Sequence, residues 1–569
     1  MHNGHGVVFK YRAVFQAVAV LCLMSVPRAA SAQMVDQTEL STISAIRNQG
    51  LQASQVMDHL SWIADVYGPR VTGTPGFSAA ADWVERRATA WGLSDVHREY
   101  FKFGPGWSFD KSVIRMTMPQ PMQIIGYPVS WTPGTNGSMT AEVVNPNISS
   151  ETDFTQWHGR LRGKVVLIQP ARAVEPIVLP LTQRYSDEDL RQLASQTPVG
   201  WQWLAGEGRD GQKDSSLSSA TSHWTDKLNA FLKAEGVVAV IERGTDSTVR
   251  SAVSFNELMP QQTQRIDGGT VFTPTGDIID ISDQKNLLPW LVIAVEQYNR
   301  MVRILQHGVP VKIEIDIAVN WYPEIGEGNG FNTLADIKGT DLGDEVVIIG
   351  AHLDGVHTAS AAIDDGAGVA MVMEAMRLIQ ELGIKPRRTI RMALWAGEEN
   401  GLLGSSAYVK RHYGDPFKGP QYTPETAHVA AYFNLDSGSG RIRGIFARHN
   451  LASEPVLQRW IEPLRDLGVT TIARRSTLSL LQGASIVSGS DHLYFDAVGI
   501  PAFELIQDRL DYFSRTAHSN MDYADRASKS DLIQGAVTLA VLAYEAAMED
   551  NLVPRRTPTP PIRLPKGNE

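Results

Sequence analysis

The sequence EVVIIGAHLD, at residues 345–354, is an apolar, β-branched run that ends in a histidine and an aspartate. Such a run, with no alternation of polar residues, is typical of a strand buried on both faces. Downstream of it, apolar residues recur at helical spacing from Val369 through Met376 to Ile379. A buried strand followed by such a helix predicts one βαβ unit of a parallel sheet.

The same alternation continues along the chain to about residue 550. We expect further strands at residues 388–394, 429–435 and 501–505, with helix-like sequence between them. Strands that alternate with helices form largely parallel sheets that are covered on both faces. Residues 316–550 are therefore predicted to form most of an α/β/α sandwich with a mostly parallel mixed sheet.

The sequence upstream of this segment divides into two parts. Residues 33–119 carry helix-like stretches on either side of the turn-rich GPRVTGTPG at residues 68–76, and are expected to complete the sandwich. Residues 120–315 have a different texture, with short β-like runs broken by Gly, Pro and Asn. These runs lie at residues 164–168, 237–241 and 290–294. We expect residues 120–315 to be an inserted β-rich domain, with an exposed loop at the Ser-rich residues 215–222.

Both ends of the chain look separate from these domains. Residues 1–32 have the features of a cleaved signal peptide: basic residues, an apolar run at 13–26 and a small-residue site at Ala30-Ser31-Ala32. The protein is therefore expected to be exported, either secreted or periplasmic. Residues 551–569 form a tail rich in proline and basic residues. No later apolar stretch is expected to reach the length needed to span a membrane.

Composition limits the function. The chain has 569 residues, 43% of them hydrophobic and 20% charged, as in ordinary globular proteins. Its one cysteine, Cys22, lies in the signal peptide, which excludes a disulfide framework and a cysteine nucleophile in the mature protein. The formal charge of −10 falls to −13 when the three basic residues of the signal peptide are removed. So acidic a protein is not expected to bind nucleic acid.

Acidic and imidazole side chains gather where the predicted strands of residues 316–550 end. Ligands of open α/β sheets bind at the carboxyl ends of the strands, so we expect these side chains to share one site. The residues are His352, Asp354, Asp364, Asp365, Glu398, Glu399, Asp436 and His518.

The residue types in this set favour a metal centre. Carboxylates in one cleft repel each other unless a cation lies between them. A mixture of imidazole and carboxylate ligands suits zinc. Two histidines and three carboxylates exceed the needs of one tetrahedral zinc with an open position, whereas two metals that share a carboxylate use the whole set. Of the adjacent pair Glu398 and Glu399, one can bind metal while the other remains free as a base. Asp354 could orient His352 through the second imidazole nitrogen.

Six motifs occur in a fixed order. They are Gly350-Ala351-His352-Leu353-Asp354, Asp364-Asp365-Gly366-Ala367-Gly368, Gly397-Glu398-Glu399-Asn400-Gly401, Asn434-Leu435-Asp436, Ser490-Asp491-His492 and His518-Ser519-Asn520. This set resembles the di-zinc exopeptidases of metallopeptidase family 28, and within them the carboxypeptidase Q-like branch. The resemblance implies the zinc-exopeptidase fold, with residues 120–315 as a protease-associated domain. It also implies peptide substrates and two zinc ions per chain.

The resemblance also implies a role for each residue. His352 and Asp436 would bind one zinc, and Glu399 and His518 the other. Asp364 would bridge the two ions, Asp365 would help to hold Asp364, and Asp354 would orient His352. Glu398 would be the general base. One departure is Gly355, where many relatives have a small hydroxyl residue.

Some assignments stay open at this point. His492 is an alternative to His518 as a ligand, although we favour positioning or substrate-side roles for Asp491 and His492. Arg515 is a candidate cation for the terminal carboxylate of a substrate, or a structural salt-bridge partner. The sequence does not separate aminopeptidase, carboxypeptidase and dipeptidase activity, and a homo-oligomer is compatible with it.

Other functions fit less well. A glutaminyl cyclase-like acyltransferase would need only one zinc, and a non-catalytic receptor-type ectodomain would not need the ligands. A serine hydrolase based on Ser439 lacks the five-residue nucleophile-elbow pattern.

Overall fold

The computed structural model describes residues 37–195, 215–244, 249–250, 263–273, 287–415, 423–447, 450–474 and 490–555. The predicted signal peptide lies outside the described residues, as does the tail beyond residue 555. Contacts divide the chain into residues 1–44 and residues 45–569.

An eight-stranded mixed sheet, which we call the first sheet, carries the predicted strands. Its order is β1-β12-β14-β13-β15-β18-β16-β17. The bounds are β1 Ser94–Phe101, β12 Gly330–Ile337, β13 Leu342–His352, β14 Arg388–Trp395, β15 Val429–Asn434, β16 Ile442–Phe446, β17 Thr471–Ala473 and β18 Ala502–Gln507. The central strands β14, β13, β15 and β18 are parallel to one another, whereas β1, β12 and β16 introduce antiparallel pairs. The predicted mostly parallel, mixed sheet is confirmed.

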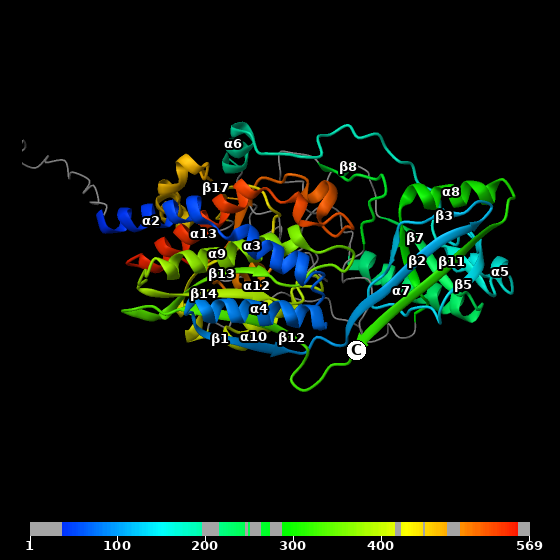
Figure 1. Ribbon diagram of the computed structural model, residues 1–569, viewed down its shortest axis with the longest axis horizontal. Coiled ribbons are helices and arrows are strands. Elements are labelled where there is room, and N and C mark those ends of the chain that lie inside the picture. The colour runs from blue at the N-terminus through cyan, green and yellow to red at the C-terminus, as the bar shows by residue number, and fades with distance from the viewer. Residues whose placement is uncertain are drawn as a thin grey trace, which may run out of the picture. The chain divides into compact units, whose positions relative to one another are not determined.

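Helices cover both faces of the first sheet. Figure 1 shows α9 (Ala367–Glu381) and α13 (Lys529–Met548) on one side of β13 and β14, and α10 (Leu403–His412) on the other. Helices α3 (Val56–Ser61) and α4 (Pro75–Trp91) pack on α9. On the opposite side α10 packs against α12 (His492–Ala497). The sandwich therefore draws its helices from both ends of the chain.

Helix α13 is the core helix of the sandwich. By length and hydropathy alone Lys529–Met548 could cross a membrane, so the expectation that no later stretch reaches that length was wrong. However, 89% of its apolar window is buried inside the protein. A helix that is apolar all round is also what a position between a sheet and other helices requires.

A second eight-stranded sheet lies between Gly106 and Tyr322, and we call residues 106–322 the second-sheet segment. Its order is β3-β2-β11-β5-β6-β7-β10-β4. The bounds are β2 Gly106–Met118, β3 Met122–Gln123, β4 Gly126–Pro128, β5 Met139–Val144, β6 Lys164–Leu167, β7 Ala239–Arg243, β10 Trp290–Ile293 and β11 Val311–Tyr322. The strands expected near residues 164, 237 and 290 are present as β6, β7 and β10. Strand β2 lies before residue 120, and β11 ends after residue 315. This sheet therefore extends beyond both of the expected boundaries of the 120–315 domain.

Helices accompany this second sheet, and one of them overturns an expectation. Three of them are α5 Thr152–Trp157, α7 Ser215–Ala234 and α8 Val295–Gln306, whereas α6 Asp187–Ser195 packs on β17 of the first sheet. The Ser-rich residues 215–222, expected to be a loop, begin α7. Its later residues Leu228 and Leu232 are buried in the core around Val240, so packing of the C-terminal half outweighs the weak helix propensity of serine.

His357 joins the second-sheet segment to a loop that follows β13. Its Nε2 lies 2.8 Å from the carbonyl oxygen of Pro128, and its ring meets the edges of Trp107 and Phe109. The side chain is buried, and burial lowers its pKa to about 4, with only partial compensation by the Pro128 carbonyl. His357 is therefore a neutral donor in the folded protein.

This arrangement predicts a pH-dependent loss of stability. In the unfolded chain a histidine takes up a proton near pH 6.5, whereas folded His357 does so only near pH 4. The contribution of His357 to the free energy of unfolding is thus complete above pH 6.5 and decreases by about 3 kcal/mol as the pH falls to 4. The free energy of unfolding is measured with urea at pH 7.0 and at pH 4.5. Between these two pH values it should decrease less for His357→Gln than for the wild type. Equal decreases would contradict the neutral buried state.

Candidate metal centre

The candidate ligands lie at the carboxyl edge of the four parallel strands. His352 is the last residue of β13, and Asp436 follows closely after β15. Glu398 and Glu399 come after the end of β14, and His518 lies in the loop that follows β18. Parallel strands point their carboxyl ends to one edge of a sheet, which is why these residues meet.

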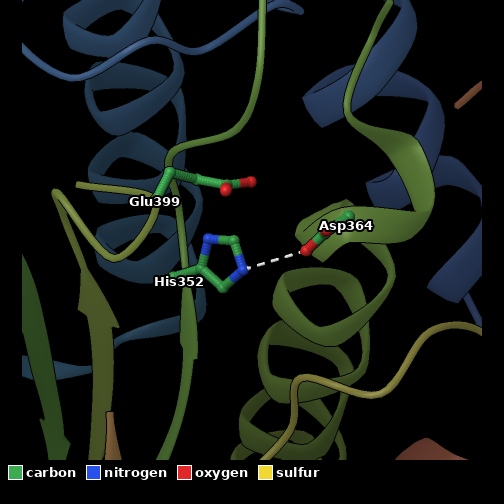
Figure 2. Close-up of side chains that lie close together, drawn as sticks. All are labelled: His352, Asp364 and Glu399. Atoms are coloured by element: carbon green, nitrogen blue, oxygen red, sulfur yellow. Dashed lines mark hydrogen bonds and ion pairs between the residues drawn. The ribbon is translucent and has the colours of Figure 1, made fainter. Parts of the chain in front are cut away.

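Asp364 lies between two imidazoles. Its Oδ1 is 3.3 Å from Nε2 of His352, and its Oδ2 is 3.3 Å from Nε2 of His518. Figure 2 shows Asp364, in the turn just before α9, facing the ring of His352, with Glu399 beside the same ring. A single carboxylate thus presents one oxygen to each histidine.

Each histidine has a further carboxylate of its own. Oδ1 of Asp436 is 3.6 Å from Nε2 of His352, and Oε2 of Glu399 is 3.2 Å from Nε2 of His518. The cluster is therefore two imidazole–carboxylate pairs that share Asp364. The sequence had left His492 open as a replacement for His518. In the structure the ring of His492 lies 4.0 Å from Glu504, and it is His518 that meets Asp364 and Glu399.

The imidazoles are held in their charged form in the metal-free protein. Burial lowers the pKa of His352, but the nearby carboxylates of Asp436 and Glu398 outweigh burial and raise it well above its usual value. Burial is likewise outweighed at His518, where Glu399 and Asp364 raise the pKa to about 10. The histidines thus partly neutralise a strongly negative pocket.

The carboxylates compete for this limited positive charge. The two imidazoles hold the pKa of Asp364 well below its usual value despite its burial. Burial and neighbouring carboxylates raise the pKa of Glu398 well above its usual value, and burial likewise raises that of Glu399. Among the described residues, Asp354 Oδ2, Asp365 Oδ2 and Glu399 Oε1 are buried without a hydrogen-bond partner. Such a site favours a cation.

Asp354 connects His352 to Glu398. Nδ1 of His352 lies 3.1 Å from the main-chain oxygen of Asp354 and 3.5 Å from its carboxylate. The same carboxylate accepts the backbone N–H of Glu398 at 3.3 Å. The predicted contact with His352 is present, although the main-chain oxygen is the nearer acceptor. One residue thus ties together the loops after β13 and β14.

Asp365 lies deeper than Asp364. Its Oδ1 accepts the backbone N–H of Gly368 at 3.0 Å, at the start of α9. Its carboxylate also lies in one group with His352 and Asp436, whose ligand atoms are within 4.8 Å of one another. A Cβ on Gly368 would lie 2.4 Å from the Asp365 carboxylate, so only glycine fits at that position.

Asp491 and Arg515 have different surroundings. Asp491 is buried just before α12, and burial raises its pKa to about 8 even though His352 acts against this. Nη1 of Arg515 is 3.5 Å from the carboxylate of Asp511, one helical turn earlier. Of the two interpretations of Arg515, this contact favours the structural salt bridge.

The structure adds Arg70 to the site, a residue noted in the sequence only as part of a turn. Arg70 is fully buried and donates four hydrogen bonds to main-chain oxygens. The acceptors are Leu353 at 2.7 Å, Ala361 at 2.8 Å, and Ile63 and Ser360 at 3.0 Å. Three of the four acceptors lie between His352 and Asp364, so Arg70 fixes the loop that separates these two candidate ligands.

Asp522 holds the Asp364 turn from the opposite direction. Its carboxylate accepts the backbone N–H groups of Ile363 at 2.6 Å and Asp364 at 3.1 Å. Burial and the charge of Asp364 raise the pKa of Asp522 to about 8. Asp522 follows His518 closely in the chain, but no motif in the sequence marked it, because it acts only on main-chain groups.

The departure at Gly355 has a local explanation. A Cβ built on Gly355 would lie 2.3 Å from the Cβ of Ala361, across the loop that Arg70 braces. A hydroxyl residue at position 355 therefore does not fit together with alanine at position 361.

Replacement of Arg70 should destabilise the whole site. Arg70→Met removes four donors and leaves buried carbonyl groups unpaired, which should lower the free energy of unfolding by about 3 kcal/mol or more. Arg70→Lys should rescue little, because an ammonium cannot reproduce the planar fork. Urea unfolding measures both. The control Arg86→Met alters an exposed residue of α4 and should change stability by no more than about 0.5 kcal/mol. An Arg70→Met variant as stable as this control would refute the bracing role.

The chain is similar to several known peptidases. The chain is 24% identical to carboxypeptidase Q of Mus musculus over 513 residues, which cover 89% of this chain and 88% of that protein. A crystal structure of a peptidase M28 precursor from Shewanella amazonensis matches with a TM-score of 0.61 at 22% identity, covering 92% of this chain and 100% of the other. A zinc aminopeptidase from Bacillus subtilis matches with a TM-score of 0.50 at 18% identity, covering 87% of this chain and 95% of the other.

The two structural matches show the shared fold. The family model described as peptidase family M28 matches residues 332–542. This segment includes every candidate ligand from His352 to His518. Residues 332–542, which contain the whole His352–His518 cluster, are thus similar to peptidase family M28.

Proposed function

We propose that the protein is an exported exopeptidase that uses two zinc ions to hydrolyse dipeptides or short peptides. The observation that carries this proposal is the position of Asp364, with one oxygen toward each of two imidazoles. His352 and Asp436 would hold one ion, Glu399 and His518 the other, and Asp364 both. Nitrogen and oxygen donors in this combination suit zinc, and buried carboxylate oxygens without partners suit a cation.

The bound ions would supply the acidity of the attacking water and the polarisation of the peptide carbonyl. Glu398 would act as the general base that removes the proton from that water and delivers it to the leaving amine. Its backbone N–H is held by Asp354, which also contacts His352. This contact would keep the base in register with the ligand. Asp365, Asp491 and His492 would shape and support the pocket.

Two observations bear on the substrate and the cofactor. Relatives that align over most of this chain are named carboxypeptidase Q, and a structural neighbour is named a zinc aminopeptidase. Both names describe removal of a residue from a peptide end. A cyclase with one zinc would use a single ligand set, whereas two sets converge on Asp364 here.

Two further segments of the chain would have roles of their own. Residues 1–32 would be removed on export, which would place the mature enzyme outside the cytoplasm. The segment expected at residues 120–315 would be an inserted protease-associated domain.

Replacement of Glu398 tests the general base. Glu398→Gln preserves shape and should retain two zinc ions per chain, while dipeptide hydrolysis should fall on the order of 10²–10⁴-fold. Glu399→Gln is the matched comparison, because it alters a ligand and should reduce zinc content as well as activity. Zinc is quantified on the same samples that are assayed. Near-normal hydrolysis by Glu398→Gln would refute its role as the base.

Blocked substrates test the exopeptidase assignment. A free dipeptide, its N-blocked form and its C-terminal amide are compared with the zinc-loaded protein. We expect hydrolysis of the free dipeptide and loss of cleavage when at least one end is blocked. Loss on N-blocking alone identifies an aminopeptidase, loss on amidation alone a carboxypeptidase, and loss with both a dipeptidase. Equal cleavage of all three, or none of any, would contradict the proposal.

A further inference from the structure

The loop that carries His518 is held by the second-sheet segment. Thr273 donates two hydrogen bonds to the main-chain oxygen of His518, one from its backbone N–H at 2.9 Å and one from its hydroxyl at 3.2 Å. The neighbouring residues Phe272 and Ser519 form an antiparallel bridge. The backbone on either side of His518 is thus fixed from outside the first sheet.

The Asn520 side chain completes this attachment. Its Oδ1 accepts the backbone N–H of Val271 at 2.7 Å, and its Nδ2 donates to the main-chain oxygen of Gly269 at 3.3 Å. Its own N–H donates to the main-chain oxygen of Val271 at 3.2 Å. We call Gly269, Val271, Thr273 and Asn520 the His518 clamp. Asn520 acts in the clamp like one further residue of a β-ladder.

His518 needs such support for a local reason. Its φ is +56°, in the left-handed region that a residue with a Cβ seldom adopts. A backbone of this kind persists only where its surroundings determine it. The adjoining turn is held from the same direction, since Ile266 N–H donates to the main-chain oxygen of Ser514 at 2.9 Å.

The position of His518 is decisive for the candidate centre. Its Nε2 is close to both Asp364 and Glu399, at 3.3 and 3.2 Å. Side chains that bind a metal must be held within about 0.5 Å of the productive geometry. A loop free to move by more than this would separate the imidazole from its carboxylates.

We propose that the His518 clamp is a positioning element of the metal centre, through which the second-sheet segment sets the affinity for the ion held by His518 and Glu399. This inference rests on the proposed zinc-dependent function. The clamp contacts described above reach the main chain of His518 and the side chain and main chain of Asn520, and none of them involves the imidazole of His518.

The test compares two amide side chains in matched settings. Asn520→Ala removes the clamp amide. Gln297→Ala removes an amide that makes the same kind of contacts within the second-sheet segment, accepting from Ile125 N–H at 2.7 Å and donating to the Gln123 oxygen at 2.9 Å. Competition with a chelator measures affinity for the two zinc ions. We expect Asn520→Ala to weaken one ion by about 10–100-fold and to leave the other unchanged. Gln297→Ala should leave both affinities unchanged.

A second pair of variants guards against misfolding. Thr273→Val removes only the hydroxyl contact and should weaken the same ion by a smaller factor, and Thr273→Ser should restore the wild-type affinity. Unchanged zinc affinity in both Asn520→Ala and Thr273→Val would overturn the inference, as would equal weakening by Gln297→Ala.

Hydrogen exchange separates this inference from the proposed function. In the metal-free protein, amides of residues 510–523 should exchange faster in Asn520→Ala than in the wild type or in Gln297→Ala. Unchanged exchange would show that the clamp does not hold the loop. If the wild-type protein bound no zinc, but the loop still exchanged faster in Asn520→Ala, the proposed zinc enzyme would be refuted. The holding of the loop by the clamp would still be supported.

Discussion

The carboxylate of Asp364 faces His352 with one oxygen and His518 with the other, at 3.3 Å in each case. This shared contact requires a strand end, a helix start and a distant loop to meet at one point. Asp522 holds the backbone of the Asp364 turn, and Arg70 holds the loop that leads into it. Helix α9 starts directly after this turn and packs on β13. Much of the sandwich therefore serves to keep one carboxylate in place.

Electrostatics limits what this arrangement can do without a cation. Several buried carboxylates share a pocket in which the two imidazoles carry most of the positive charge. Burial and the charge of Asp436 raise the pKa of Glu398 although His352 acts against them, whereas the two imidazoles outweigh burial at Asp364 and lower its pKa. Divalent cations would relieve both groups at once. The pocket is thus suited to metal binding at a cost in the stability of the metal-free protein.

The sequence predicted the edge of the sheet at which the site lies, but not what holds the site together. His352, Glu399 and Asp436 directly follow apolar strands, and the parallel arrangement of those strands can be predicted from alternation with helices. Arg70, Asp522 and the His518 clamp act through main-chain groups far away in the chain. Neither residue type nor spacing predicts such contacts, because any donor or acceptor that the fold places there could make them. The helix at residues 215–222 was missed for a similar reason, since the residues that stabilise it lie in its other half.

The most direct test of the account is the anomalous scattering of zinc in crystals of the zinc-loaded protein. The account predicts two peaks about 3.5–4 Å apart, one on each side of the Asp364 carboxylate. The first should lie against His352 and Asp436, and the second against Glu399 and His518. A single peak, or peaks that leave Asp364 uncoordinated, would contradict the shared carboxylate on which the proposed chemistry depends.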